Sequence, residues 1–401
     1  MSTSLLYHTF NLKGVKYKST KFKGNRIIFS AEMTDKLAVC PACKSKKVVY
    51  KGRKSRMLLL GKFNKKIIIL KLIVHRIHCK SCEKIRWPHL PFAPGKKRYT
   101  NSFAILANEL LRFGTIKSTA QFLGVSWDLV KSIHGEKLQK TYKNIELRDI
   151  EYISIDEFSI KKGHQYMTIV IDLKTGRIIH SAQGKSKDSV ADFLKELHKK
   201  AKRLKAVTID MGRPYFAAAT ENLPGVDIVF DKFHVSSLIN RALDDIRREQ
   251  QRSLNHKESK VLKGTRFLLL SKYDNLAEDH KTRLNNLLQI NKPLFIAHSM
   301  KEQLNIFWKL EDMEKAKQFL NTWCKDALNT GIKQFAKVAK TISSLKTAFL
   351  NYFKHRITSG RIEGINNKIK TLKRQAYGFR DMVYFKLRLF HLHKQGYSLS
   401  G

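Results

Sequence analysis

The pattern of apolar and polar positions divides the N-terminal third of the chain into β and α segments. Apolar and basic residues alternate loosely over residues 1–36, which predicts short strands or an extended arm. Residues 57–75 alternate more regularly and are rich in β-branched side chains, so they predict a β-hairpin. Over residues 103–111 the apolar positions recur at helical spacing, which predicts one buried helix face.

The segment that follows has the layout of a helix-turn-helix. Ala120 and Phe122-Leu123 form the apolar side of a first short helix, and Gly124 supplies the turn. Ser126 is placed to cap a second helix. In such motifs the second helix enters the major groove of DNA, with its first turns against the base edges. We therefore expect DNA contacts from four side chains of this helix: Trp127, Asp128, Lys131 and His134.

From about residue 150 the pattern changes to a succession of short strands. Residues 152–160 alternate as a strand, and two further strands are joined by a turn at Lys174-Thr-Gly. An amphipathic segment and two short apolar runs follow, so we expect a mixed sheet. The remaining predicted elements are strands at 165–173, 177–182, 206–210 and 227–231, and helices at 186–202, over 234–355 and over 360–394.

Composition and charge narrow the class of protein. The chain has 401 residues, more than one ordinary domain, and its 78 Lys and Arg against 33 Asp and Glu give a net charge of +45. With 42% hydrophobic residues it can still build packed cores. The charge therefore indicates a folded protein that binds a polyanion. DNA and RNA are the favoured partners, and an anionic membrane surface is the weaker alternative. No apolar run approaches the roughly 18 residues of a membrane span, and the N-terminus has no pattern of a secretion signal.

Four of the five cysteines form two Cys-x-x-Cys pairs, Cys40/Cys43 and Cys79/Cys82. Two such pairs supply the four thiolates of a closed tetrahedral zinc site, which has no open position for catalysis. We expect a structural Zn²⁺ here, with the hairpin between the pairs bringing them together. The alternative is two unrelated pairs of buried thiols. His75 and His78 are less favoured candidates for a zinc ligand. Cys324 is expected to be a core residue.

Acidic residues lie at the predicted ends of two apolar strands. Asp156 and Asp210 are poor packing residues there, but two or three carboxylates suffice to hold Mg²⁺. Two such metals can activate the attacking oxygen and stabilise the leaving oxygen in phosphodiester chemistry. We choose Glu363 as the third carboxylate. Glu157, which is adjacent to Asp156, is expected to point to the opposite sheet face.

Further polar residues accompany these carboxylates. Glu363 shares one predicted helix face with Asn367, Lys370 and Arg374, an arrangement suited to a metal and phosphates. Asp231 and His234 follow the last predicted strand. Two interpretations of this pair stay open. The two side chains either support the metal ligands or contact DNA near the metals, or Asp231 caps a helix N-terminus and His234 is buried.

Taken together, these features resemble the ISL-three (ISL3) family of bacterial insertion-sequence transposases of the Asp-Asp-Glu type, essentially end to end. Besides the cysteine finger and the helix-turn-helix, the resemblance rests on the motifs Ile155-Asp-Glu-Phe, Val207-Thr-Ile-Asp-Met-Gly-Arg-Pro-Tyr, Val229-Phe-Asp-Lys-Phe-His-Val, Ser359-Gly-Arg-Ile-Glu-Gly-Ile-Asn-Asn-Lys-Ile-Lys and Arg374-Gln-Ala-Tyr-Gly-Phe. The resemblance implies a ribonuclease-H-like catalytic fold with Asp156, Asp210 and Glu363 as the metal-binding triad, interrupted by an all-helical insertion.

The function that we expect is that of a DNA transposase. It would bind the terminal inverted repeats of an insertion sequence and cut a DNA strand with the help of two Mg²⁺ ions, for which Mn²⁺ can substitute. The freed 3′-hydroxyl would then attack target DNA. We expect a homodimer or larger assembly on double-stranded DNA, no membrane and no nucleotide cofactor. The expected location is the bacterial cytoplasm, in association with the nucleoid. The alternatives are a non-catalytic DNA-binding regulator or inactive transposase remnant, and a nuclease for branched DNA or RNA.

The expected fold class is multidomain α+β. The predicted domains are an N-terminal arm with a four-cysteine zinc-binding domain (1–95), a helix-turn-helix domain (96–149), the first part of the catalytic domain (150–235), an all-helical insertion (236–355) and the final catalytic helix with Glu363 (356–401).

Overall fold

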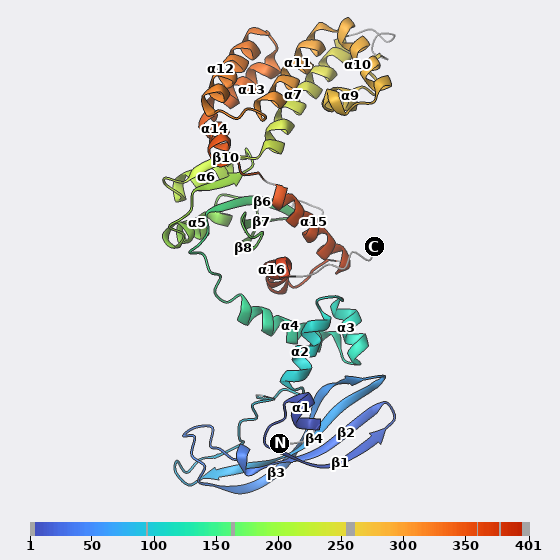
Figure 1. Cartoon of the computed structure of the whole chain (residues 1–401), viewed down its shortest axis with the longest axis vertical. Helices are drawn as coiled ribbons and strands as arrows, with labels where there is room; N and C mark the ends of the chain where they lie inside the picture. The colour runs from blue at the N-terminus through green and yellow to red at the C-terminus, as the bar shows by residue number, and fades with distance from the viewer. Residues whose placement is uncertain are drawn as a thin grey trace. The chain divides into compact units, whose positions relative to one another are not determined.

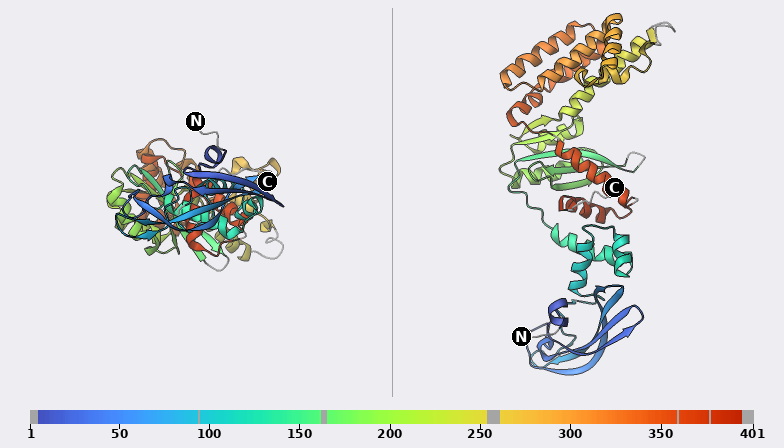
Figure 2. Two further views of the ribbon diagram at one scale, coloured as in Figure 1. Left: turned by 90° about the horizontal axis from the view of Figure 1, so that it is seen from below. Right: turned by 45° about the vertical axis from the view of Figure 1, so that its right-hand side comes forward.

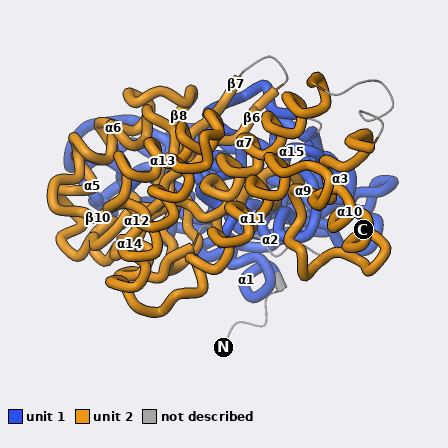
Figure 3. Tube along the Cα trace, turned by 90° about the horizontal axis from the view of Figure 1, so that it is seen from above, with its two compact units in different colours: residues 1–144, 373–401 blue, residues 145–372 orange. Residues whose placement is uncertain are grey.

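A computed structural model describes residues 5–93, 95–161, 165–253, 261–358, 360–376 and 378–394. Ser359 and Tyr377, which belong to two of the motifs quoted above, lie outside these residues. The chain divides into two compact units, coloured in Figure 3: residues 1–144 with 373–401, and residues 145–372. The predicted final catalytic segment, 356–401, is thus divided: residues 356–372 belong to the second unit and residues 373–401 to the first.

The first unit begins with a sheet built on a long hairpin. Strands β3 (Val48–Phe63) and β4 (Lys66–Cys79) pair in antiparallel fashion, which confirms the predicted hairpin and extends it to both Cys pairs. The sheet order is β1-β2-β4-β3, and β5 pairs with β4. One face buries an apolar core that includes Leu58, Leu70 and Leu72. The other elements here are α1 (Leu5–Phe10), β1 (Val15–Lys23), β2 (Arg26–Met33), a 3₁₀ turn (Asp35–Leu37) and β5 (Ile85–Arg86).

Two helices joined by a short turn lie where the sequence predicts the helix-turn-helix. Helix α3 (Ile116–Leu123) ends at Gly124, whose φ of 68° is a left-handed conformation that glycine adopts without strain. Helix α4 (Trp127–Thr141) begins after Ser126, whose hydroxyl accepts a hydrogen bond from the N–H of Leu129, as the capping prediction required. Phe122 was expected to pack inside but is exposed. The other helices of this unit are α2 (Asn101–Leu110), α16 (Met382–His391) and a 3₁₀ turn (Leu392–Lys394).

The second unit contains the predicted mixed sheet, in the order β10-β9-β6-β7-β8. Strands β6, β7 and β8 are antiparallel neighbours, whereas β9 is parallel to β6 and β10 is parallel to β9. In Figures 1 and 2, α15 lies against this sheet. The bounds are β6 (Tyr152–Lys161), β7 (Gln165–Asp172), β8 (Ile178–Gln183), β9 (Ala206–Ile209), β10 (Asp227–Phe230), α5 (Asp188–Lys200), α6 (Arg213–Asn222) and α15 (Gly360–Gln375).

A helical region lies between β10 and α15, as the sequence predicted. Its apolar residues join those of the sheet in one continuous core that includes Trp323 and Phe349. No helix among the described residues is both long enough and apolar enough to cross a membrane. The helices are α7 (Lys232–Ser253), α9 (Arg266–Leu270), α10 (Glu278–Ile290), α11 (Lys292–Phe307), α12 (Met313–Asn329), α13 (Lys333–Ser344) and α14 (Lys346–His355), with a 3₁₀ turn at Tyr273–Asn275.

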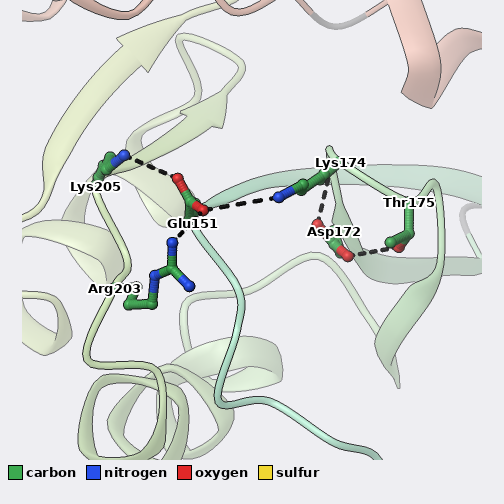
Figure 4. Close-up of polar contacts among 6 residues, drawn as sticks. All are labelled: Glu151, Asp172, Lys174, Thr175, Arg203 and Lys205. Atoms are coloured by element: carbon green, nitrogen blue, oxygen red, sulfur yellow. Dashed lines mark hydrogen bonds and ion pairs between the residues drawn. The ribbon is translucent and has the colours of Figure 1, made fainter.

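An ionic network anchors the end of the second sheet where β6 and β9 begin (Figure 4). The carboxylate of Glu151 lies 2.8 Å from Nζ of Lys205, 3.1 Å from the guanidinium of Arg203 and 3.9 Å from Nζ of Lys174. The three cations come from the segment before β9 and the turn after β7. Because β6 and β9 are parallel, fixing their starts at one end also fixes how their far ends align.

The turn between β7 and β8 supports α15. Asp172 closes this turn by accepting hydrogen bonds from the N–H of Lys174 at 3.0 Å and from the hydroxyl of Thr175 at 2.5 Å (Figure 4). Arg361, in the first turn of α15, donates a hydrogen bond to the carbonyl of Lys174. The start of α15 is therefore held by the same sheet that carries Asp156.

Candidate active site and metal sites

The sheet of the second unit brings Asp156 and Asp210 to the same place. Ser154 of β6 pairs with Thr208 of β9 in parallel register, so the same register continued by two residues sets Asp156 opposite Asp210. Asp210 directly follows β9, as predicted. Asp156 does not end its strand, because β6 continues to Lys161 through its pairing with β7. The two carboxylates still lie near enough, beyond the last paired residues of β6 and β9, for the charge of Asp210 to act on Asp156.

Asp156 is held between two hydrogen-bond donors. Its Oδ1 accepts from the N–H of Glu157 at 2.8 Å, and its Oδ2 accepts from Nδ2 of Asn366 on α15 at 2.7 Å. Burial raises the pKa of Asp156, and the charge of Asp210 adds to this, although the Asn366 hydrogen bond opposes it. The pair is therefore one negative site that a nearby cation would stabilise.

Glu157 lies on the other side of the same strand, as the alternation of a β-strand requires. It pairs with Thr168 of β7, whose hydroxyl lies 2.8 Å from the hydroxyl of Tyr215 on α6. Burial raises the pKa of Glu157, and the charges of Asp210 and Asp156 raise it further. Its Oε2 is buried without a hydrogen-bond partner. Glu157 therefore adds negative charge to the site from the opposite face of the sheet.

The third predicted carboxylate, Glu363, is exposed in the first turn of α15. The ligand atoms of Asp156, Asp210 and Glu363 do not all lie within 4.8 Å of one another. Asn366 follows Glu363 by three residues and therefore shares its helix face. The helix is fixed on the sheet by a stripe of buried side chains: Ile362, Ile365, Ile369 and Leu372.

The polar residues predicted to accompany Glu363 lie on the solvent side of α15. Asn367, Lys370 and Arg374 are all exposed, and Oδ1 of Asn367 accepts from Nζ of Lys370 at 3.4 Å. The amide that reaches Asp156 is that of Asn366, which sequence reasoning missed. The available signal was the spacing of the buried isoleucines, which places residue 366 nearer to the sheet than residue 367.

Asp231 and His234 follow β10 at the same edge of the sheet as Asp210. Asp231 donates its N–H to the carbonyl of Ile209 at 3.0 Å, and its carboxylate accepts from the N–H of Phe233 at the start of α7. His234 is exposed, 3.7 Å from Asp231, and its charge lowers the pKa of Asp156. The N-cap interpretation therefore holds for Asp231, but the buried-histidine part does not, because His234 faces solvent near Asp156.

The four predicted zinc ligands converge at one end of the β3–β4 hairpin. The Sγ atoms of Cys40 and Cys82 are 3.6 Å apart, and those of Cys43 and Cys79 are 3.5 Å apart. All four Sγ atoms lie within 4.8 Å of one another, and no other group of three or more Cys, His, Asp or Glu side chains in the described residues does so. A tetrahedral ion with Zn–S distances of about 2.3 Å needs sulfurs about 3.8 Å apart, so the cluster could hold zinc.

The backbone around the cysteines is shaped as two matching turns. Lys44 and Glu83, each one residue beyond a Cys-x-x-Cys pair, have positive φ values of 61° and 54°. The N–H of Cys40 donates to the carbonyl of Ser45, and that of Cys79 to the carbonyl of Lys84. Backbone N–H groups of Cys43 and Ala42 lower the pKa of Cys40, which favours the thiolate.

The other side chains considered as zinc ligands contact different groups in the structure. Nε2 of His75 lies 2.9 Å from Glu32, and Nε2 of His78 lies 2.9 Å from Glu83. Cys324 is buried in α12, where its thiol contacts the carbonyl of Ala339 at 3.8 Å. The sequence-based preference for a four-cysteine set is therefore consistent with the geometry.

The four predicted DNA-contacting residues of α4 differ in their exposure. Trp127 is 54% exposed and Asp128 is also exposed, so both are available to a partner. Lys131 is half-buried, with its Nζ 2.8 Å from Asp381. His134 is only 3% exposed, and its Nδ1 is hydrogen bonded to the hydroxyl of Tyr384 at 2.7 Å. His134 is thus a core residue and not a surface available to DNA, which corrects the prediction for it.

Comparisons with known proteins find relatives of this chain among transposases. A transposase family, DDE_Tnp_ISL3, matches residues 153–389. The transposase for insertion sequence element IS1001 of Bordetella parapertussis is 29% identical over 371 residues, which are 91% of each chain. The transposase for IS1557 of Mycobacterium tuberculosis is 27% identical over 288 residues, which are 66% of this chain and 65% of that protein.

Among solved structures, the Drosophila P element transposase strand transfer complex matches with a TM-score of 0.37 and 11% identity, over 63% of this chain and 78% of that chain. The family match spans more than half of the chain and contains Asp156, Asp210 and Glu363. The chain therefore belongs to the ISL3 family of DDE transposases, enzymes that cut and join DNA.

Proposed function

We propose that this chain binds the terminal inverted repeats of an insertion sequence and catalyses Mg²⁺-dependent strand cleavage and strand transfer, with Asp156, Asp210 and Glu363 as the metal ligands of a ribonuclease-H-like domain. The observation that carries the proposal is the register that sets Asp156 opposite Asp210 in adjacent parallel strands. The proposal is tested by incubating the purified chain with Mg²⁺ and a duplex that carries the repeats flanking its gene. We expect cleavage at the repeat, and binding without any cleavage would favour a non-catalytic regulator.

The side chains around Asp156 fit a divalent cation. Mg²⁺ prefers oxygen ligands, and Oδ1 of Asn366, whose Nδ2 reaches Asp156, is buried without a hydrogen-bond partner. When bound, Mg²⁺ activates the attacking oxygen and stabilises the leaving oxygen of a phosphodiester. We propose two Mg²⁺ per site, with Mn²⁺ able to substitute. The role of the chain is then to hold the aspartates in register and to orient Asp156 through Asn366.

The proposed role of Glu363 rests on its position one helical turn before Asn366. Residues three apart lie on the same helix face, about 4.5 Å apart along the axis. Because Asn366 already reaches Asp156, we propose that a rearrangement of α15 or of the Glu363 side chain on DNA brings a third carboxylate to the pair. Lys370 and Arg374 lie further along the exposed side of α15, where we propose that they contact DNA phosphates.

DNA binding is proposed for the helix-turn-helix and for the basic surface around it. Trp127 and Asp128 are exposed at the start of α4, where a recognition helix meets base edges. The net charge of +45 supplies cations for phosphate contacts, with repeat and target DNA as the double-stranded partners. Joining two transposon ends requires two recognition units, so we propose a homodimer or larger assembly on DNA.

Replacing Asn366 with Ala is expected to lower cleavage and Mg²⁺ affinity by about 10- to 100-fold, as is typical when a residue that orients a metal ligand is lost. The physical reason is its hydrogen bond to Asp156. Asn367→Ala is the matched control, because the neighbouring amide is exposed and does not reach the pair. Titration of cleavage against Mg²⁺ measures the effect, and equal loss in both variants would contradict this role for Asn366.

Binding of end duplex is expected to weaken steeply with salt. Each phosphate neutralised contributes a slope of about −0.9 in log K against log salt, so six to ten contacts lower affinity by about 10³- to 10⁵-fold between 50 and 200 mM. Fluorescence anisotropy over this range measures the slope. A flat response would show that the positive charge is not used for DNA binding.

A further inference from the structure

Helix α16, which follows the helix of Glu363, packs directly on the recognition helix α4 of the helix-turn-helix. Two pairs of polar side chains cross this contact. Nδ1 of His134 lies 2.7 Å from the hydroxyl of Tyr384, and the hydroxyl of Tyr142 lies 2.9 Å from Nδ1 of His391. The first pair is buried, where a hydrogen bond left unmade is costly, so it fixes the rotation of one helix against the other.

The contact extends along one side of α4 towards its DNA-facing start. Nζ of Lys131 forms an ion pair with Asp381 at 2.8 Å and also lies over the ring of Tyr384. A Cβ atom added to Gly135 would lie 3.8 Å from Cδ2 of that ring, at ordinary van der Waals distance, so the two helices approach each other closely here. Lys131 is therefore held by α16 rather than free to take any position.

The adjoining side of α4 packs on the first helix of the helix-turn-helix. Val130 and Ile133 are buried, in the apolar clusters that also contain Ala120 and Leu123 of α3. With one side of α4 packed on the motif and another on α16, the exposed remainder includes Trp127, Asp128 and Ser132. The two packed sides together determine which residues α4 can present to a groove.

We propose that α16 is a positioning element of DNA recognition: through Tyr384 and Asp381 it sets the orientation of α4 and restrains Lys131, so that the chain discriminates end DNA from other duplexes. This inference rests on the proposed function. It assigns a role in reading DNA to a segment that lies beyond the active-site helix in the sequence. Residues 376–381 alone separate the end of α15 from the start of α16.

Restraint of Lys131 matters for specificity because a free lysine binds any phosphate. An ammonium paired with Asp381 contributes less to sequence-independent attraction and is available only where DNA displaces the carboxylate. Asp381 also caps α16 by accepting from the N–H of Tyr384 at 2.9 Å, and Asn can make the same cap. The substitution Asp381→Asn therefore removes the charge and keeps the helix.

The experiment compares binding of end duplex and scrambled duplex by the full chain and three variants. Tyr384→Phe removes the hydroxyl that meets His134 and is expected to lower the preference for end duplex by about 3- to 10-fold. Asp381→Asn is expected to strengthen binding to scrambled duplex and to steepen its salt slope by up to about 0.9, one additional phosphate contact. Val383→Ala is the matched control, because Val383 lies on α16 but is 67% exposed.

The outcomes separate the inference from the function on which it rests. If the unaltered chain shows no preference for end duplex, the proposed function fails. If it shows the preference and both Tyr384→Phe and Asp381→Asn keep the same preference and salt slope, α16 has no positioning role. Should Tyr384→Phe unfold the first unit, seen by circular dichroism, Asp381→Asn alone decides, because its pair is partly exposed.

Discussion

Asp156→Asn and Asp210→Asn are each expected to reduce Mg²⁺-dependent cleavage of end duplex by at least about 10³-fold. Asparagine has nearly the same shape as aspartate but lacks the charge, so the substitution removes metal affinity and leaves the strand packing intact. A metal ion supplies several kcal/mol of transition-state stabilisation, and each 1.36 kcal/mol is about tenfold in rate. Glu363→Gln is expected to have an effect of the same order.

These substitutions are expected to reduce DNA cleavage without weakening DNA binding. Binding of the same duplex is expected to be unchanged or slightly stronger, because each variant removes a negative charge near DNA. Asp192→Asn on α5 is the matched control, since its side chain is 99% exposed and lies on a helix outside the site. Cleavage that persists in all three triad variants would show that the metal ligands are misassigned. Cleavage that persists only in Glu363→Gln would move the third ligand elsewhere.

Removing one thiolate from the four-cysteine cluster is expected to abolish DNA binding and to unfold the cysteine end of the first unit. A structural zinc site contributes about 10–16 kcal/mol of apparent binding free energy, which exceeds the stability of a typical domain. The variant is Cys79→Ser, since Cys79 lies in β4 and its loss disturbs both pairs. Metal analysis of the unaltered chain is expected to give one zinc per chain.

The matched control is Cys324→Ser, which alters the one cysteine outside the cluster. It is expected to keep one zinc per chain, because this thiol lies in α12 and contacts the carbonyl of Ala339. Full zinc content in Cys79→Ser, or none in the unaltered chain, would contradict the site.

Alternation and helical spacing predicted the elements of the second unit well because its sheet and helices have clearly buried faces. The strands β6 to β10 and helix α5 were all expected, and so was the β3–β4 hairpin. Two features of the second unit were not predicted from the sequence. Helix α6 was not predicted, because Gly212 and Pro214 are common in loops, although proline is also favoured in the first turn of a helix. The continuation of β6 beyond Asp156 depends on pairing with β7, which local sequence does not reveal.

The sequence predicted that Asp156 and Asp210 lie close together at the candidate site. It did not predict which side chains form hydrogen bonds with them. The spacing of the isoleucines in α15 favours Asn366 over Asn367, but the sequence does not show that this apolar face packs on the sheet that carries Asp156. His134 was placed among DNA contacts because the helix-turn-helix alone does not show that a distant helix covers it. The contact between α4 and α16 joins residues about 250 positions apart, as the His134–Tyr384 hydrogen bond shows.

The most direct test of the account is to locate the metal in a complex of the chain with end duplex and Mn²⁺, by anomalous diffraction. We expect manganese between Asp156 and Asp210, with a carboxylate oxygen of Glu363 within about 2.2 Å of an ion. Manganese bound without Glu363, or no manganese at this edge of the sheet, would contradict the triad on which the proposed chemistry depends.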